Sequence, residues 1–221
     1  MCGRFTMVTP GQIIAEAFGL GDVPELAPRY NIAPSQQVAV VRDAARAGRE
    51  LGLLRWGLIP PWAKDRSFGV RMINARAETV MEKPAFRAAF RARRCLIVAD
   101  GFYEWQKLGD RKRPHHIRMA DGRPFGFAGL WESWTGADGQ TVESCAIVTT
   151  TPNEVLAPIH DRMPAIVEPE SYAAWLDPTQ RDAAVLAGIL RPYAAGAMVA
   201  TPVSLVVNNP ANDAPECIWP A

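Results

Sequence analysis

The sequence lacks the features that mark several large classes of protein. Its 221 residues contain no apolar run approaching the roughly 20 residues of a membrane-spanning helix. The opening residues, MCGRFT, do not have the basic and then apolar pattern of a secretory signal peptide. No internal repeat or low-complexity tract is visible, which argues against solenoids and disordered linkers. We therefore expect a soluble cytoplasmic protein.

Cysteines are few, and the charges of the two signs nearly cancel. The four cysteines (Cys2, Cys95, Cys145 and Cys217) are too widely spaced for a zinc knuckle or a CxxC redox motif. We expect free thiols in a reducing compartment, no metal site and no cofactor. With 24 Lys and Arg against 23 Asp and Glu, the net charge of +1 identifies no partner. Binding to nucleic acid depends on where the charges lie.

Hydrophobic residues make up 48% of the chain, enough for a substantial core. The 19 prolines and 17 glycines are spread throughout, which predicts short strands and turns with few long helices. Predicted strands are Gln37–Val41, Leu51–Trp56, Cys95–Ala99, His115–Met119, Phe125–Leu130, Cys145–Thr149 and Ala165–Val167. Predicted helices are Thr9–Phe18, Lys83–Arg94, Glu170–Trp175 and Thr179–Leu190. The simplest interpretation is a single mixed domain over residues 1–221, with helices at its periphery.

Cys2 is the first residue with distinctive chemistry. Removal of the initiator Met, which a small second residue favours, would give Cys2 a free α-amine beside its thiol. The unperturbed pKa values of these groups are about 8 and about 8.5, so both are partly nucleophilic near neutral pH. With an aldehyde, the amine forms an imine and the thiolate then closes a thiazolidine ring, which fits the known use of N-terminal nucleophiles. The alternative is that Cys2 is an ordinary buried or inert residue.

Three short motifs contain polar side chains suited to catalysis. In an extended segment Asn74 and Arg76 project to one face, where they would suit a sugar and its phosphate. Glu104 stands among aromatic residues, and an apolar setting raises a carboxyl pKa toward neutrality, as general acid–base catalysis requires. His160 is one of only three histidines, and Arg162 would lie on the same side of an extended segment. Taken alone, each motif also fits a structural role in a loop or at a strand edge.

A scattered set of basic and aromatic residues suits single-stranded nucleic acid. Residues 55–62 combine aromatic faces with prolines, and Arg87, Arg91 and Arg94 share one face of the second predicted helix. Basic grooves with stacking aromatics bind single strands. The alternative is that Trp56 belongs to the core and that the arginine face is merely solvated.

The motifs together give the chain a specific resemblance. It resembles the SOS-response-associated peptidase (SRAP) family, whose members process abasic sites, and the likeness covers nearly the whole chain. It implies a mixed α+β fold around a distorted, barrel-like sheet with a positively charged groove. The segment from Pro202 to Asn208 resembles the family's last core strand. The matching segments are Cys2–Phe5, Arg29–Pro34, Trp56–Pro60, Ile73–Thr79, Gly101–Trp105 and His160–Pro164.

The resemblance also implies a role for each matching residue. Cys2, freed by self-catalysed loss of Met1, would bond covalently to the ring-opened aldehyde of an abasic site in single-stranded DNA. His160 would assist ring opening, Glu104 would move protons during imine formation, and Asn74 would position Cys2. The family's phosphate-gripping and base-stacking positions fall on Arg4, Pro34, Trp62, Arg76, Trp105 and Arg162.

Two departures from the family pattern concern DNA affinity. A phosphate-binding arginine of some relatives aligns near Lys83–Pro84, and a single Trp62 stands where some relatives have two adjacent tryptophans. The resemblance otherwise implies an enzyme that shields abasic sites during the DNA damage response. We expect it to act as a monomer, to associate with the nucleoid when bound to damaged DNA, and to contact no membrane.

Three other functions fit the same residues. A cysteine peptidase would use Cys2, His160 and Glu104 as nucleophile, base and orienting group, and would cut other proteins. A non-catalytic module would bind single strands without a covalent step. A lyase would form an imine at the Cys2 amine, cut the strand by β-elimination and leave.

Overall fold

Five strands close into a small barrel at the centre of the molecule. The computed structural model describes residues 2–21, 23, 25–43 and 48–221. β10 pairs in parallel with β4 on one side and antiparallel with β9 on the other, which completes the circuit β10-β4-β3-β6-β9. The barrel strands are β3 (Gln37–Asp43), β4 (Arg49–Trp56), β6 (Arg94–Ala99), β9 (Phe125–Thr135) and β10 (Thr141–Thr150).

A second sheet continues from the barrel. Its order is β13-β8-β7-β1-β2, and its neighbouring strands are antiparallel. Only Asp100 separates the end of β6 from the start of β7, so the chain passes from barrel to sheet at that residue. The strands of this sheet are β1 (Phe5–Met7), β2 (Arg29–Ile32), β7 (Gly101–Leu108), β8 (Arg111–Met119) and β13 (Met198–Pro202).

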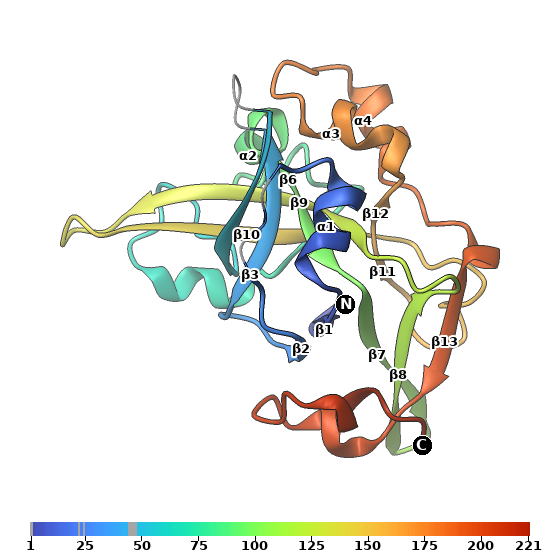
Figure 1. Cartoon of the computed structure of the whole chain (residues 1–221). Helices are drawn as coiled ribbons and strands as arrows, with labels where there is room; N and C mark the ends of the chain where they lie inside the picture. Colours follow the sequence, from blue (N-terminus) through green and yellow to red (C-terminus); the bar gives the residue numbers. More distant parts are fainter. Residues whose placement is uncertain (1, 22, 24, 44–47) are drawn as a thin grey trace.

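Short strands and helices surround these sheets. β5 (Asn74–Arg76) runs parallel to the end of β10, β11 (Met163–Pro164) pairs antiparallel with β10, and β12 (Ile166–Val167) pairs with β9. In Figure 1, α2, α3 and α4 gather at one end of the molecule, and the C-terminal segment lies at the other end near the β7–β8 hairpin. The helices are α1 (Gly11–Phe18), α2 (Arg87–Ala92), α3 (Tyr172–Leu176) and α4 (Ala183–Ile189), with 3₁₀ turns η2 (Arg66–Arg71), η3 (Pro169–Ser171), η4 (Ala195–Ala197), η5 (Leu205–Asn208) and η6 (Pro215–Ile218).

The buried carboxylate of Asp100 ties the start of the chain to this framework. Its Oδ1 accepts from Thr6 Oγ1 at 2.6 Å, and its Oδ2 accepts from the backbone nitrogens of Val8 and Thr9 at 2.5 and 2.7 Å. The Thr9 hydroxyl adds a further bond at 2.9 Å. A buried carboxylate is tolerated only when its oxygens are satisfied. This set of bonds therefore fixes the end of β1 against the turn between β6 and β7.

The seven strands predicted from the sequence pattern and the barrel-like α+β architecture are confirmed, with differences at the helix ends. The predicted helix Lys83–Arg94 is shorter, because Arg94 begins β6 and its buried guanidinium donates to the carbonyl oxygens of Phe90, Trp175 and Asp177. Arg94 therefore does not share an exposed face with Arg87 and Arg91, as the helical pattern had predicted.

The predicted last strand at residues 202–208 is also wrong. β13 ends at Pro202, and residues 205–208 form η5, whose start is stabilised by Ser204 Oγ accepting from Val206 N at 3.3 Å. Among the described residues no helix is long and apolar enough to cross a membrane.

Gly101 allows β1, β7 and β8 to approach closely. A Cβ atom at this position would lie 2.1 Å from His116 Nε2 and 2.8 Å from Thr6 Oγ1. We expect Gly101→Ala to lower the free energy of unfolding by about 1–3 kcal/mol, the usual cost of overpacking. Chemical denaturation measures this change. The matched control is Gly188→Ala in α4, where a Cβ meets nothing within 4 Å and should leave stability unchanged or raise it by up to ~1 kcal/mol. Equal effects of the two substitutions would contradict the packing argument.

Candidate active site

Cys2 lies buried just before β1, at the edge of the barrel. Its exposed fraction is 0%, and its Sγ is 3.8 Å from the carbonyl oxygen of Arg4. Asn74 Nδ2 donates a 2.8 Å hydrogen bond to the carbonyl oxygen of Cys2. Asn74 is itself held by β5, which pairs with Ile147 of β10. The carbonyl group of Cys2 is therefore anchored to the barrel wall through Asn74.

Glu104 provides a buried carboxyl group beside Cys2. It stands on β7, opposite His115 of β8, and only 2% of it is exposed. Burial raises the pKa of Glu104 to about 7. Burial also raises the pKa of the Cys2 thiol, and the negative charge of Glu104 raises it further. A carboxyl group with this pKa can give or take a proton near neutral pH.

His160 completes the group from a turn that precedes β11. Its Nε2 is 3.8 Å from Glu104 Oε2, and Gln106 Nε2 on β7 donates to the carbonyl oxygen of Pro158 at 3.1 Å, which ties the turn to β7. The backbone nitrogen of Arg162 donates to His160 Nδ1 at 3.0 Å. Burial lowers the His160 pKa, whereas the neighbouring Asp161 carboxylate acts in the opposite direction. His160 Nδ1 also lies 3.0 Å from Asp161 Oδ1, and the tautomer that lets Nδ1 accept from Arg162 is the one with its proton on Nε2, facing Glu104.

The side chains of Cys2, Asn74, Glu104 and His160 come from parts of the chain that are far apart in sequence. Asn74 Oδ1 is buried and, among the residues that the structure describes, receives no hydrogen bond, so it remains an acceptor within the site. A thiol, a carboxyl group that titrates near neutrality and a neutral imidazole suit nucleophilic attack on an electrophilic carbon with proton transfer. Met1, whose removal we predict, lies outside the described residues.

Arg76 and Arg162 lie together beside the end of β10. Arg162 forms a two-pronged pair with the Glu78 carboxylate, at 2.6 and 2.9 Å, and also donates to the carbonyl oxygen of Thr149 at 2.6 Å. This pairing lowers the pKa of Glu78. Arg76 is exposed and pairs with Thr149 in the β5–β10 register. A phosphate bound by Arg162 would therefore have to compete with Glu78.

Arg4 and Trp105 lie together at the C-terminal segment. Arg4 Nη1 donates to Asn31 Oδ1 at 2.9 Å and to the carbonyl oxygen of Val207 at 3.0 Å, and burial lowers its pKa. Trp105 Nε1 donates to Asn208 Oδ1 at 2.7 Å. Both predicted DNA-contacting residues are thus positioned by η5.

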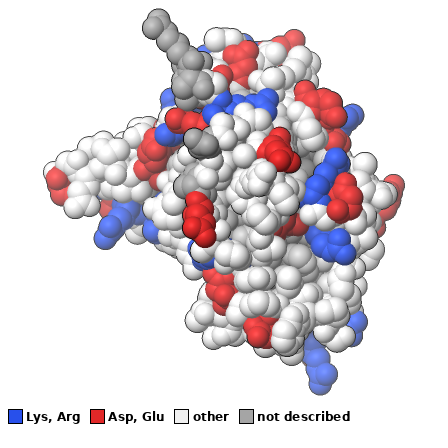
Figure 2. All heavy atoms as spheres, viewed as in Figure 1, with Lys and Arg blue, Asp and Glu red and all other residues white. Residues whose placement is uncertain are grey.

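The two remaining predicted contact residues lie in loops. Trp62 is 57% exposed, and its ring packs edge-on against Phe68 at 5.0 Å. Pro34 is half-buried and precedes Ser35, which has a positive φ of 73° and donates from its backbone nitrogen to the carbonyl oxygen of Trp56 at 2.8 Å. The face in Figure 2 carries acidic and basic side chains intermingled over its described part, so this view shows no continuous basic track.

Sequence reasoning missed the partners that hold these residues. Asn31 is fully buried, and its Nδ2 donates to the carbonyl oxygens of Val207, Asn209 and Asn212. Both Glu78 and Asn31 stand inside motifs that the resemblance had selected, which is the one signal that could have found them. Glu78 pairs with a residue 84 positions away, and the carbonyl partners of Asn31 Nδ2 lie 176 or more positions away, so no local pattern identifies these contacts.

Comparison with known proteins places this geometry in context. A sequence model of the family described as SOS response associated peptidase (SRAP) matches residues 1–210. The chain is 46% identical to "Abasic site processing protein YoqW" of Bacillus subtilis, over 99% of both chains. It is 32% identical to "Abasic site processing protein HMCES" of Xenopus tropicalis, over 90% of this chain and 68% of that one. A crystal structure of a protein from Bacteroides thetaiotaomicron matches all of both chains with a TM-score of 0.89 at 26% identity.

The raised pKa of Glu104 predicts a pH-dependent cost to stability. Because the folded protein holds this proton more tightly than the unfolded chain does, the contribution is favourable below about pH 4.5 and is lost as the pH rises through about 7. Gln cannot titrate, so Glu104→Gln should gain stability relative to the wild type across that window. Denaturation at several pH values checks this, with exposed Glu25→Gln as the control. A constant difference between wild type and Glu104→Gln would refute it.

Proposed function

Because the chain belongs to the SOS response associated peptidase (SRAP) family, we propose that it processes abasic sites in single-stranded DNA through Cys2. The observation that carries the proposal is the placement of a position-2 cysteine, held by Asn74, beside Glu104 and His160. The relatives from B. subtilis and X. tropicalis are named as abasic site processing proteins, which supports the choice of substrate.

The proposed reaction requires the α-amine of Cys2, and so the loss of Met1. The amine adds to the aldehyde carbon of the ring-opened sugar, and loss of water leaves an imine. The Cys2 sulfur then attacks the imine carbon, the thiol proton leaves, and the former imine nitrogen gains a proton. The product is a thiazolidine that joins the protein covalently to DNA. No oxidant or cofactor is needed, because every bond change is an addition or a dehydration.

Each neighbouring group has a defined part in these steps. Burial keeps the Cys2 thiol protonated, so its attack needs a nearby base, and the Glu104 carboxylate is suited to take that proton. The same group, once protonated, donates during dehydration. Asn74 holds the Cys2 carbonyl and offers Oδ1 as an acceptor for the amine or the sugar hydroxyl. The Nε2 proton of His160 suits transfer to the ring oxygen as the closed sugar opens.

The remaining expectations belong to the same proposal. Arg4, Arg76 and Arg162 would bind phosphates on either side of the lesion, while Pro34, Trp62 and Trp105 would contact unpaired bases. The partner is thus a single strand, bound by a monomer formed from one domain. Self-catalysed removal of Met1 is supported by the nearness of Cys2 to Glu104 and His160, which resembles a peptidase arrangement. The reaction would take place on cytoplasmic DNA and at the nucleoid.

The covalent step predicts a specific adduct. Protein mixed with a single-stranded oligonucleotide carrying one abasic site should gain the mass of the DNA less one water, and should lack the mass of Met1. Intact-mass spectrometry after denaturation measures both. Cys2→Ala should form no stable adduct, because it keeps an amine but has no thiol to close the ring. Cys95→Ala, which removes a buried thiol from the barrel, is the matched control and should react like the wild type.

Other outcomes separate the alternatives. Cleavage of the strand without a lasting adduct would favour the lyase function. Equal binding of abasic and intact strands by wild type and Cys2→Ala, with no adduct in either, would favour a non-catalytic binding module. Hydrolysis of added protein substrates without any reaction with DNA would favour the peptidase.

The Arg162–Glu78 pair makes a prediction about DNA affinity. Glu78→Gln removes the carboxylate that occupies the guanidinium, so an intact single strand should bind more tightly. The salt dependence of binding should steepen by about 0.7 in log K against log salt, because Arg162 is then available to one more phosphate. Fluorescence anisotropy over a salt series measures both. Glu82→Gln removes the same charge from an exposed position in the same segment, and an equal effect there would mean that net charge alone is responsible.

A further inference from the structure

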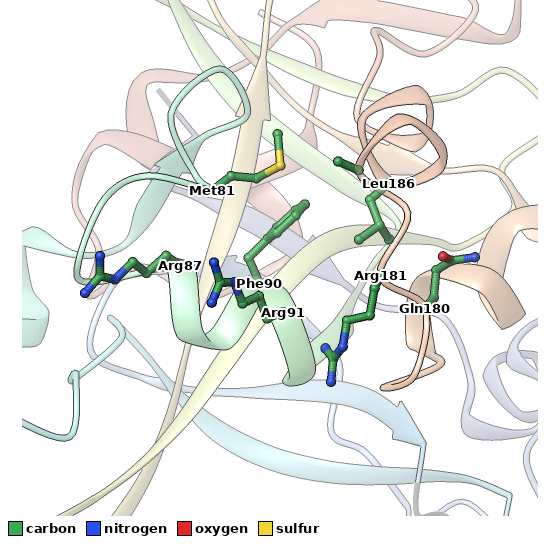
Figure 3. A pocket seen from close by; sticks show the side chains of 8 residues that line it. Met81, Arg87, Phe90, Arg91, Gln180, Arg181 and Leu186 are labelled. Atoms are coloured by element: carbon green, nitrogen blue, oxygen red, sulfur yellow. The ribbon is translucent and has the colours of Figure 1, made fainter.

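A small pocket lies between α2 and the start of α4, apart from the residues of the proposed reaction. Its volume is about 220 Å³, below the roughly 300–1,000 Å³ of pockets that take drug-sized ligands. Met81, Phe90 and Leu186 form its apolar side, and the guanidinium groups of Arg87, Arg91 and Arg181 follow the opposite side (Figure 3). The remaining lining residues are Gln180 and Ala183.

The charged residues that line this pocket are all basic. Neither Asp nor Glu is among the lining residues, and none of the three arginines forms an ion pair with another described residue. Asp182, which follows Arg181, uses its carboxylate to accept from Ala184 N at 2.8 Å, at the start of α4. The buried Arg94 adds a further cation, whose pKa is lowered by burial and then by the charge of Arg181.

This arrangement works against local stability. Arg87 and Arg91 stand four residues apart on α2, where like charges repel. Arg94 and Arg181 lie close enough to repel as well. A ligand with negative charge would relieve this repulsion and cover the apolar side of the pocket at the same time.

We propose that the pocket binds an acidic peptide segment of a partner protein, with one large apolar side chain as its anchor. The volume suits one such side chain, and the arginines suit carboxylates on either side of it. A nucleic acid is the less suitable ligand, because stacking needs an exposed aromatic face. Phe90, the only aromatic residue in the lining, is 3% exposed and packs edge-on against Trp175.

The test uses a short fluorescein-labelled peptide of aspartates around one phenylalanine. It should bind the wild type in fluorescence polarisation, and binding should weaken with added salt. The double substitution Arg87→Glu with Arg91→Glu should weaken binding by about tenfold or more. Ala183→Met, which fills the pocket without changing charge, should also weaken it. Arg191→Glu changes an exposed arginine outside the pocket and is the matched control.

Three results would overturn the proposal. One is no binding of the peptide by the wild type. Another is a failure of either comparison: the wild type and the double arginine variant bind the peptide equally, or the wild type binds equally well a peptide whose phenylalanine is replaced with serine. The third is tighter binding of labelled oligothymidylate that is lost in the same arginine variant, which would make the pocket a nucleic-acid site. Adduct formation by Cys2 should be unchanged in Ala183→Met, so failure of the peptide test leaves the proposed reaction unaffected.

Discussion

The position of Cys2 in the candidate active site depends on the buried carboxylate of Asp100. It gathers bonds from Thr6, Val8 and Thr9 and so locks the first strand against the turn that leads out of the barrel. Without this set of bonds β1 would be a three-residue strand at the end of the chain, where order is usually poorest. With it, Cys2, the second residue, sits in the core with an exposed fraction of 0%.

Burial has two opposite consequences in this site, one for stability and one for proton transfer. Burial makes the thiol of Cys2 a poor acid and makes the carboxyl of Glu104 a weak one, which costs stability but matches the pKa of Glu104 to neutral pH. The strand pairing of the barrel offsets this cost. β10 pairs with β4, β9, β5 and β11, and through β5 it supports Asn74. The acid, the amide and the imidazole are therefore held by separate, well-supported elements.

Much of this arrangement was predictable from the sequence, and the limits have physical causes. Strand positions follow from β-branched and apolar runs between turns, so all seven predicted strands appear. The four proposed catalytic positions came from the family resemblance, since no spacing rule brings Cys2, Asn74, Glu104 and His160 together. The predicted ends of helices were wrong where a tertiary contact outweighs the local pattern. Arg94 fits the helical spacing of the preceding arginines, but its guanidinium donates to backbone carbonyl oxygens of α2 and α3 and is held in the interior. The pairing of Arg162 with Glu78 was equally invisible, because it joins residues 84 apart.

The contacts made by residues 207–212 determine when the surroundings of the first strand can form. Arg4 is held by the carbonyl oxygen of Val207, and Asn31 is held by three carbonyls between residues 207 and 212. A nascent chain still attached to the ribosome presents its first residues long before those carbonyls exist. Contacts of such long range also slow folding, because closing a long loop costs chain entropy before the contact can form. The surroundings of Arg4 and Asn31 are therefore completed only when residues 207–212 have been made and have joined the fold.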